Sequence, residues 1–383
     1  MSVHLPKLER RPELDALRGL FLVWMTLTHL PTRTSDFVNQ PFGFISSAEG
    51  FVFMSALLVG RIYMQKLTHN KARARMQLWK RSLKIYGYHV LMLVVAFTVV
   101  AEFAIRTHHA ALYNLLNFYI GHPAVAIIGS LLLIYCPPLL DILPMYVIFL
   151  FFTPLILSLV LGVGWRKVLL VSGLVWLAAQ FHLRELVHNF IVHITHLPIP
   201  LQETGAFNLF AWQAVWIVGL WLGAESATGS VPLKYVPRWA VAVAGGVCLF
   251  FIGVRHSWLG PHLTQQSLGL QLDKWQIGPL RVLNLIAFAI VAYWLRKYVV
   301  KLVAREPLLT LGKASLHVFS AHLIFVFVGL ALLYNEAEPL HGMAAFVLLA
   351  VTFAVLILVA ANEARRQRDI QRRKSGIEAT PSA

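Results

Sequence analysis

The stretch LDALRGLFLVWMTLTHL, residues 14–30, has the length and apolar content of a membrane-spanning helix, yet it contains Asp15, Arg18 and His29. An ionisable side chain near the bilayer centre costs about 3 kcal/mol on insertion scales, so it more often marks a functional site than an anchor. The question that this stretch raises is what kind of site it belongs to.

The composition of the whole chain supplies the membrane context. The 383 residues are 58% hydrophobic and 13% charged, with a mean hydropathy of +0.68, which lies outside the range of soluble domains. Long apolar runs recur throughout and predict an all-α polytopic membrane protein with about ten helices that cross ~30 Å of hydrocarbon. The ten expected spans are residues 14–31, 47–65, 85–105, 140–161, 167–182, 208–225, 239–256, 280–296, 307–334 and 342–362. No signal-peptide cleavage pattern follows the first, so we expect it to be retained.

The net charge of +16 is explained by topology rather than by a nucleic-acid partner. With the N-terminus in the cytoplasm, most of the 33 Lys and Arg residues fall in cytoplasmic segments, which is the positive-inside bias, and both termini are then cytoplasmic. The apolar segment 123–135 is too short to span comfortably, and counting it would invert every later loop against this bias. We therefore predict that it is re-entrant or interfacial.

The expected domain organisation is simple. Residues 1–362 are predicted to form a single integral-membrane domain, and residues 363–383 a basic and polar cytoplasmic tail without order. Two cysteines support neither a disulfide framework nor a metal cluster. His193 and His196 have the i,i+3 spacing of metal ligands, but no third ligand stands at an established spacing, so solvent-facing histidines and no metal are expected.

The polar residues of the first span fall on one stripe. Asp15 and Arg18 are i,i+3 neighbours that can pair. His29 lies within about 20° of the face of Arg18 and ~16 Å further along the axis, so the stripe crosses much of the bilayer. The plainer alternative is a snorkelling Arg18 paired with Asp15, with His29 at the outer rim.

A carboxylate is expected near that histidine. Glu49 begins the second span, at the end that a hairpin with the first span would bring beside His29. A carboxylate next to an imidazole orients the ring and raises its basicity, as general-base catalysis requires. An exposed interfacial Glu49 is the alternative, and for Ala56 and Gly60 we expect close packing of helices through small side chains.

Cationic residues at expected cytoplasmic helix ends suggest an anionic ligand. Lys80, Arg81 and Lys84 stand at i, i+1 and i+4 and suit phosphate oxygens, although most of that basic segment is the solvated loop expected on the cytoplasmic side. Lys313 stands at the start of the ninth span, where free backbone N–H groups also favour an anion.

The ninth span contains further polar groups. Ser315 and His322 are seven residues apart and share a face, while His317 points elsewhere. A histidine within a span is commonly a hydrogen-bonded packing residue, but two within six positions beside Lys313 favour a functional role.

Expected outer helix ends carry groups that suit a sugar. Asn208, Trp212 and Gln213 lie close together in the segment NLFAWQ, and Asp141 is placed at a similar height. Amide and carboxylate groups bond hydroxyls, and an aromatic face stacks on a sugar ring. An interfacial aromatic belt explains Trp212 equally simply.

At this point the sequence resembles the acyltransferase-3 superfamily of membrane O-acyltransferases. An Arg and a His with ten residues between them in the first span, here Arg18 and His29, are that group's signature, and Gly312, Ser315 and His322 are similar to its last recognisable block. The segments RPELDALRGLFLVWMTLTHLP, FGFISSAEGFVFMSALLVGRIY, DILPMY and NLFAWQ look more closely like the OpgC branch, which is associated with succinylation of osmoregulated periplasmic glucans.

The resemblance implies a multi-pass protein of the bacterial inner membrane, surrounded by lipid, with a cytoplasmic acyl-CoA donor (succinyl-CoA by family association) and a periplasmic glucan acceptor. By motif match, Arg18 and His29 take the family's essential pair, and Lys80, Arg81 and Lys84 fall in its donor-binding cluster.

The expected mechanism follows from these assignments. His29 is the general base, Glu49 orients it, and Arg18 with Asp15 lines the path of the donor. Asp141, Asn208, Trp212, Gln213, Ser315 and His322 are expected to contact substrate. The competing hypothesis is a secondary transporter with Asp15, Arg18, His29, Glu49 and His322 as a relay. We find no second copy of the first-span block, and this lack of an internal repeat disfavours a transporter.

Overall fold

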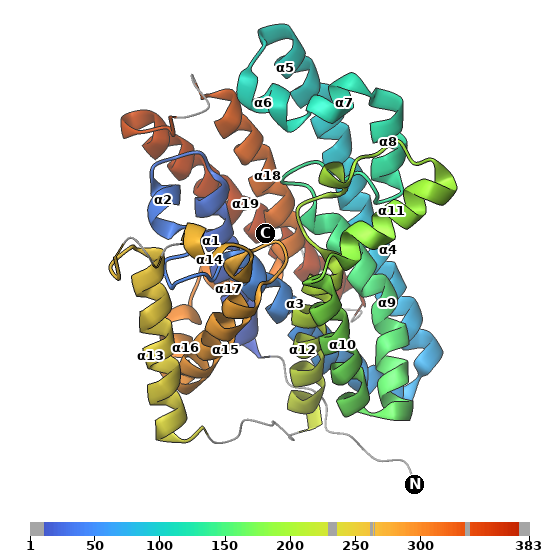
Figure 1. The fold of residues 1–383 in the computed structure, drawn as a ribbon, viewed down its shortest axis with the longest axis vertical. Coiled ribbons are helices and arrows are strands. Elements are labelled where there is room, and N and C mark those ends of the chain that lie inside the picture. Colours follow the sequence, from blue (N-terminus) through green and yellow to red (C-terminus); the bar gives the residue numbers. More distant parts are fainter. Residues whose placement is uncertain (1–10, 229–235, 261–262, 264, 334–337, 375–383) are drawn as a thin grey trace, which may run out of the picture. The chain divides into compact units, whose positions relative to one another are not determined.

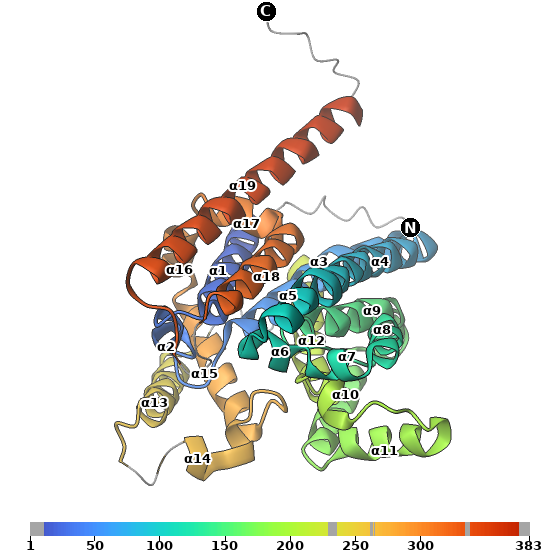
Figure 2. The same ribbon diagram turned by 90° about the horizontal axis from the view of Figure 1, so that it is seen from above.

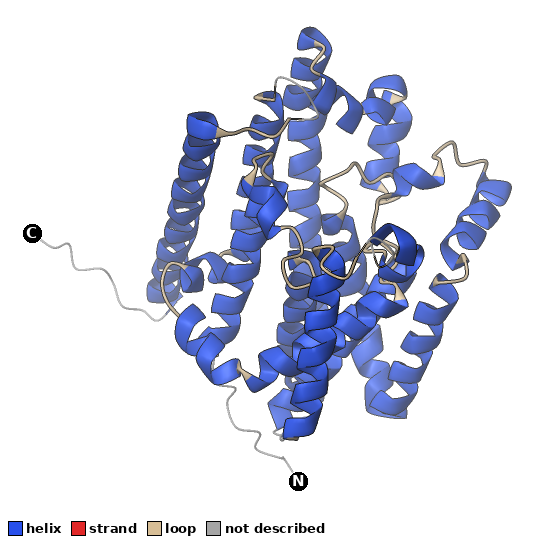
Figure 3. Cartoon of the chain, turned by 60° about the vertical axis from the view of Figure 1, so that its left-hand side comes forward, coloured by secondary structure: helices blue, strands red, loops and turns tan. Residues whose placement is uncertain are grey.

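The computed structural model describes residues 11–228, 236–260, 263, 265–333 and 338–374. Helix makes up 81% of the structure, and the described residues form no β-strand, which confirms the all-α class (Figure 3). The chain divides into two compact units that are each described by themselves: unit 1 contains Gln40–Leu295, and unit 2 combines Arg10–Asn39 with Arg296–Ala383.

Unit 2 is assembled from the two ends of the described chain. Its helices are α1 (Pro12–His29), α2 (Thr34–Val38), α16 (Arg296–Val303), α17 (Leu308–Lys313), α18 (Ser315–Ala331) and α19 (Gly342–Lys374). Helix α1 begins with a proline in its first turn, which is pre-set for the helix, and it packs on α17 and α18, while α19 covers α17 and α18 (Figure 2). A backbone bridge between Thr32 and Leu340 ties the segment after α1 to the segment before α19.

Unit 1 contains the remaining helices. In chain order they are α3 (Ser47–His69), α4 (Lys71–Val95), the π-helix η1 (Ala96–Val100), α5 (Ala101–Thr107), α6 (Ala110–Leu115), α7 (Asn117–Gly121), α8 (Pro123–Leu131), α9 (Ile142–Val163), α10 (Trp165–Ala179), α11 (Leu183–Thr195), η2 (Leu201–Thr204), α12 (Leu209–Thr228), α13 (Arg238–Arg255), α14 (Gln265–Leu268), η3 (Gly269–Leu272) and α15 (Pro279–Trp294). Helix α3 packs on α12, α4 on α9, and α13 on α15 (Figure 1).

The α3–α12 contact confirms the expected role of small residues. A Cβ atom built on Gly60 would lie 2.2 Å from the carbonyl oxygen of Leu220, so only glycine lets the two backbones approach this closely. Ala56 is fully buried in the same contact, against Gly219 of α12. These residues therefore pack helices, as membrane helix pairs commonly do.

In the part of the chain that the structure describes, six helical segments are long and apolar enough to cross a membrane. A seventh is obtained if α15 and α16, whose axes meet at a bend of 78°, count as one span. The six are Ser47–His69, Lys71–Thr107, Ile142–Val163, Leu201–Ala227, Arg238–Arg255 and Gly342–Arg373. The other three expected spans correspond to shorter or more polar helices: α1 carries charged residues, α10 has only 15 residues, and α17 and α18 are separated at Ala314. The count of ten and the orientation of the termini stay predictions.

Two expectations about segments can be compared directly with the structure. The apolar segment 123–135 contains only α8, a helix of nine residues, which is too short to span and agrees with a re-entrant or interfacial segment. The expected disorder from residue 363 is wrong up to Lys374, because α19 continues without a break past residue 362. The final residues, 375–383, lie outside the described part of the chain.

Candidate functional site

Unit 2 brings the polar stripe of α1 against one face of α18. Arg18 donates a hydrogen bond from Nη2 to Ser315 Oγ, and Nδ1 of His29 lies 3.2 Å from Nε2 of His322. The two imidazole rings are stacked, with centroids 5.5 Å apart. The expectation that Ser315 and His322 share a face is confirmed, since both meet the stripe that carries Arg18 and His29. His317 lies 3.5 Å from Glu363 of α19, so it points elsewhere, as predicted.

The hydrogen-bond partners of the two histidines determine their tautomers. Nδ1 of His322 lies 2.5 Å from the carbonyl oxygen of Phe319, and because a carbonyl only accepts, Nδ1 carries the proton. In neutral His322 the lone pair is then on Nε2, so His29 donates from Nδ1. The lone pair of neutral His29 is therefore on Nε2.

Close backbone contact holds α1 in this register. A Cβ atom built on Gly312 would lie 1.7 Å from the carbonyl oxygen of Asp15, so glycine is required where α17 meets α1. The helix break at Ala314 follows, and α18 begins at Ser315, which places that hydroxyl in the first turn of the new helix. Asp15 is buried on the same helix as Arg18, and the expected pairing of these two side chains stays a prediction.

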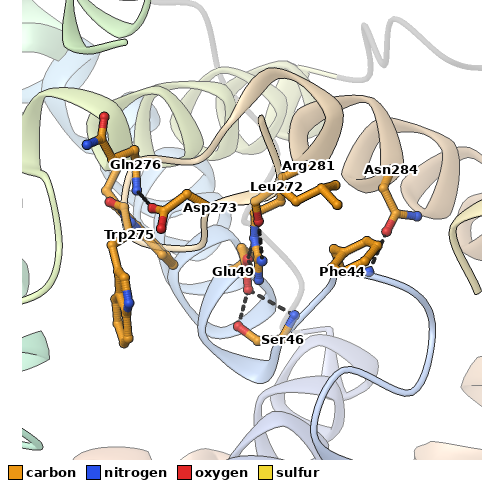
Figure 4. A network of polar contacts seen from close by, with 10 residues as sticks. Phe44, Ser46, Glu49, Leu272, Asp273, Trp275, Gln276, Arg281 and Asn284 are labelled. Carbon is orange, nitrogen blue, oxygen red and sulfur yellow. Dashed lines mark hydrogen bonds and ion pairs between the residues drawn. The ribbon is translucent and has the colours of Figure 1, made fainter. Parts of the chain in front are cut away.

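A second polar network lies in unit 1, at the first turns of α3 and α15 (Figure 4). Glu49 and Arg281 form an ion pair whose side chains are only 1% and 2% exposed. Nε and Nη2 of Arg281 lie 2.6 Å and 2.5 Å from the same oxygen, Oε1 of Glu49, and Nη1 donates to the carbonyl of Leu272. Asn284, one turn further along α15, accepts from the backbone N–H of Phe44 at 2.7 Å. The ion pair and this bond tie residues 44–49 to α15.

This network corrects the role expected for Glu49. Its second carboxylate oxygen accepts the backbone N–H and the hydroxyl of Ser46, which together form the capping box of α3. Both oxygens are thus bonded within unit 1, and Glu49 is buried there rather than exposed, so the alternative of an exposed interfacial Glu49 is wrong. Within unit 2, the printed partner of the His29 ring is His322.

The four residues expected to contact a sugar are directed into unit 1 instead. Trp212 is fully buried and Asn208 is 1% exposed, so neither presents a face to a ligand. Gln213 exchanges hydrogen bonds with Ser172 of α10, and the buried carboxylate of Asp141 accepts the backbone N–H of Ala206. The expectation that Trp212 stacks on a sugar is therefore wrong, because a side chain without exposed surface cannot do so.

The cationic residues expected to bind phosphate remain accessible. Lys80 and Lys84 are exposed on α4, and Arg81 is half-buried. Lys66 at the end of α3 lies within electrostatic range of Arg81 and donates to Gln77 of α4. Lys313, in unit 2, is exposed at the last residue of α17 rather than at a helix start.

Several residues of these networks were not foreseen from the sequence. The sequence analysis does not single out Arg281, although a charged residue two positions after Pro279, at the start of an apolar helix, was a usable signal. Lys274 and Trp275 precede the same helix and gave no periodic signal, because they lie in a loop.

Comparison with known proteins identifies the family of the chain. No curated protein and no solved structure matches the chain. A family model does: the model described as OpgC protein matches residues 10–368, which include Arg18, His29, Glu49, Arg281 and His322. With nearly its whole length matched, and with both polar networks inside the match, this chain belongs to the OpgC protein family.

Proposed function

We propose that this protein is a multi-pass membrane O-acyltransferase that transfers a succinyl group from cytoplasmic succinyl-CoA to a hydroxyl group of a periplasmic glucan. Membership of the OpgC family suggests a glucan-modifying transferase. The observation that carries the reaction type is the pair His29–His322, because its hydrogen bonds place the lone pair of neutral His29 on Nε2, the atom that acts as the base in this proposal.

The proposed reaction is direct acyl transfer. Nε2 of His29 takes the proton of the glucan hydroxyl as the oxygen attacks the thioester carbonyl of the donor. Collapse of the tetrahedral intermediate forms the ester and breaks the C–S bond, and the thiolate takes the proton back from His29. General-base help of this type is typically worth about 10²–10⁴ in rate.

His322 acts as a positioning residue in this proposal. Its Nε2 accepts from Nδ1 of His29 both before and after His29 is protonated, so the ring orientation is kept and the imidazolium is stabilised. Arg18, held by Ser315, supplies a fixed guanidinium on the same stripe, and we propose that it contacts the donor with Asp15 as its counter-charge.

The proposal is tested on the glucan itself. Mass spectrometry of the periplasmic glucan fraction, from cells with and without this protein, should show succinyl half-esters only when the protein is present. Purified protein given succinyl-CoA and unsubstituted glucan should form the same product. Unchanged glucan in both experiments would contradict the proposal and favour the transporter.

Donor binding makes a separate prediction. Neutralising Lys80, Arg81 and Lys84 to Gln should weaken CoA binding to the purified protein roughly tenfold, since exposed ion pairs contribute up to about 1 kcal/mol each. The affinity of the unchanged protein should fall as salt rises. Titration calorimetry measures both effects.

The matched control is a variant with Arg365, Arg366 and Arg368 of α19 changed to Gln, which removes the same charge from another exposed basic segment. This control should bind CoA normally. Equal weakening in both triple variants would show a general charge effect and would remove the α4 cations from the donor site.

A further inference from the structure

The loop Leu272–Gly278, which precedes α15 in unit 1, is fixed by hydrogen bonds from neighbouring helices. The carbonyl oxygen of Trp275 accepts two bonds from α12 and the residue before it, from Asn208 N at 3.0 Å and Trp212 Nε1 at 3.1 Å. Two further bonds come from α10 and the residue after it. Trp176 Nε1 donates to the carbonyl oxygen of Ile277 at 2.9 Å, and Gln180 Nε2 donates to the carbonyl oxygen of Gln276 at 2.9 Å. Hydrogen bonds from two neighbouring helices therefore fix three consecutive carbonyl groups of the loop.

The buried residues of the segment NLFAWQ thus have a defined structural purpose. Asn208 and Trp212 hold the loop directly, and Gln213 fixes α10, the helix that carries Trp176, through Ser172. Within the loop, Asp273 Oδ1 accepts from Gln276 N at 2.7 Å. Ile277 has a φ of 48°, a left-handed conformation that is strained for a β-branched residue and that persists only where the surroundings impose it.

Two side chains of this loop, Lys274 and Trp275, stay partly exposed. The ring of Trp275 is packed edge-on against Phe207, yet the residue is 39% exposed. The ammonium of Lys274 lies 4.5 Å from the centroid of that ring. Among the residues that the structure describes, no carboxylate lies within ion-pair distance of this ammonium.

The surrounding charges compensate Lys274 only in part. Glu49 and Arg281 both act on it but form a neutral pair with each other, and Asp141 is close enough only for a long-range attraction. Burial lowers the pKa of Lys274, which means that the loss of water by its charged form outweighs the attraction of Glu49 and Asp141. A bound anion at this position would replace the stabilisation that the ammonium of Lys274 loses with its water.

We propose that Lys274 and Trp275 form a binding subsite for the acceptor, which takes a sugar that carries an anionic substituent. The ammonium pairs with the carboxylate or phosphate of the substituent, and the exposed part of the indole packs on the apolar face of the sugar ring. This rests on the proposed function in one respect, that the acceptor is a carbohydrate. It moves the sugar contact from Trp212 to Trp275, which Trp212 holds in place.

Direct binding tests this proposal without any acyl donor. Two probes are used with purified protein in detergent: a short glucose oligomer, and the same oligomer bearing succinyl half-esters. The unchanged protein should bind the anionic probe about tenfold more tightly, corresponding to about 1.4 kcal/mol, and this preference should shrink as salt rises. Lys274→Gln should abolish the preference and keep the affinity for the neutral oligomer.

The aromatic contact has its own variants. Trp275→Ala should weaken both probes by a similar factor, whereas Trp258→Ala, which removes an indole that is 69% exposed outside this loop, should change neither. Thermal unfolding confirms that each variant is folded. An unchanged preference in Lys274→Gln, or no preference in the unchanged protein, overturns the subsite.

The outcome is separable from the reaction. His29→Gln should keep the preference for the anionic oligomer, because that preference depends on the charge of Lys274. An unchanged protein that shows the Lys274-dependent preference but transfers no succinyl group would overturn the proposed function and leave the subsite. Succinyl transfer by an unchanged protein that shows no preference for the anionic oligomer would overturn the subsite and leave the proposed function.

Discussion

His29→Gln should abolish acyl transfer, with a loss of about 10²–10⁴-fold, while the protein still folds and binds CoA. Glutamine keeps a polar side chain that can bond His322, but its amide cannot accept a proton at neutral pH. His29→Ala should be equally inactive. Initial rates of succinyl transfer to glucan, measured beside CoA affinity, check this result.

Two variants of His322 distinguish a positioning role from a packing role in the same assay. His322→Gln places an amide oxygen close to the position of Nε2 and should keep part of the activity, whereas His322→Leu fills the space without an acceptor and should lose most of it. If Leu were tolerated as well as Gln, the hydrogen bond from His29 would have no part in catalysis. Substantial transfer by His29→Gln would remove His29 as the base.

Glu49→Gln should destabilise the protein by about 3–5 kcal/mol, because it leaves the guanidinium of Arg281 buried without its counter-charge. Glutamine still accepts from Ser46, so the capping box is kept and the change isolates the ion pair. Arg281→Met should destabilise by a similar amount for the opposite reason. The shift of the unfolding midpoint in detergent measures both.

The double variant Glu49→Gln with Arg281→Met is the informative comparison. With both charges removed, most of the lost stability should return, since a buried pair replaced by neutral groups is often tolerated. Activity should return with stability if Glu49 is structural. A stable double variant without transfer activity would restore Glu49 to the chemistry.

The sequence predicted what depends on a single helix. The positions of Arg18 and His29 along one stripe, and of Ser315 and His322 on one face, follow from 3.6 residues per turn and are confirmed by the pairs that they form. The all-α class and the packing role of Gly60 follow equally from local composition.

What depended on distant pairing was not predictable in this way. Glu49 was assigned to His29 because the two helices follow each other in the chain, but its partner is Arg281, 232 residues away. Periodicity also shows only that Trp212 lies on one face of its helix, not whether that face is buried in the protein or exposed. In the sequence, an indole that is buried with its Nε1 bonded cannot be distinguished from one that stacks on a sugar. The loop residues Lys274 and Trp275 lack periodicity altogether.

The construction of unit 2 from the two ends of the chain sets an order on its biogenesis. The residues that pair across α1 and α18 are separated by 293 and 297 positions, so at synthesis rates of about 5–20 residues per second α1 waits roughly 15–60 s in the membrane before its partners are made. During that interval Arg18 and His29 lack the groups that satisfy them in the folded protein. A nascent chain released before α18 has every contact of unit 1 encoded but lacks the partners of Arg18 and His29, so the proposed base would not be positioned in it.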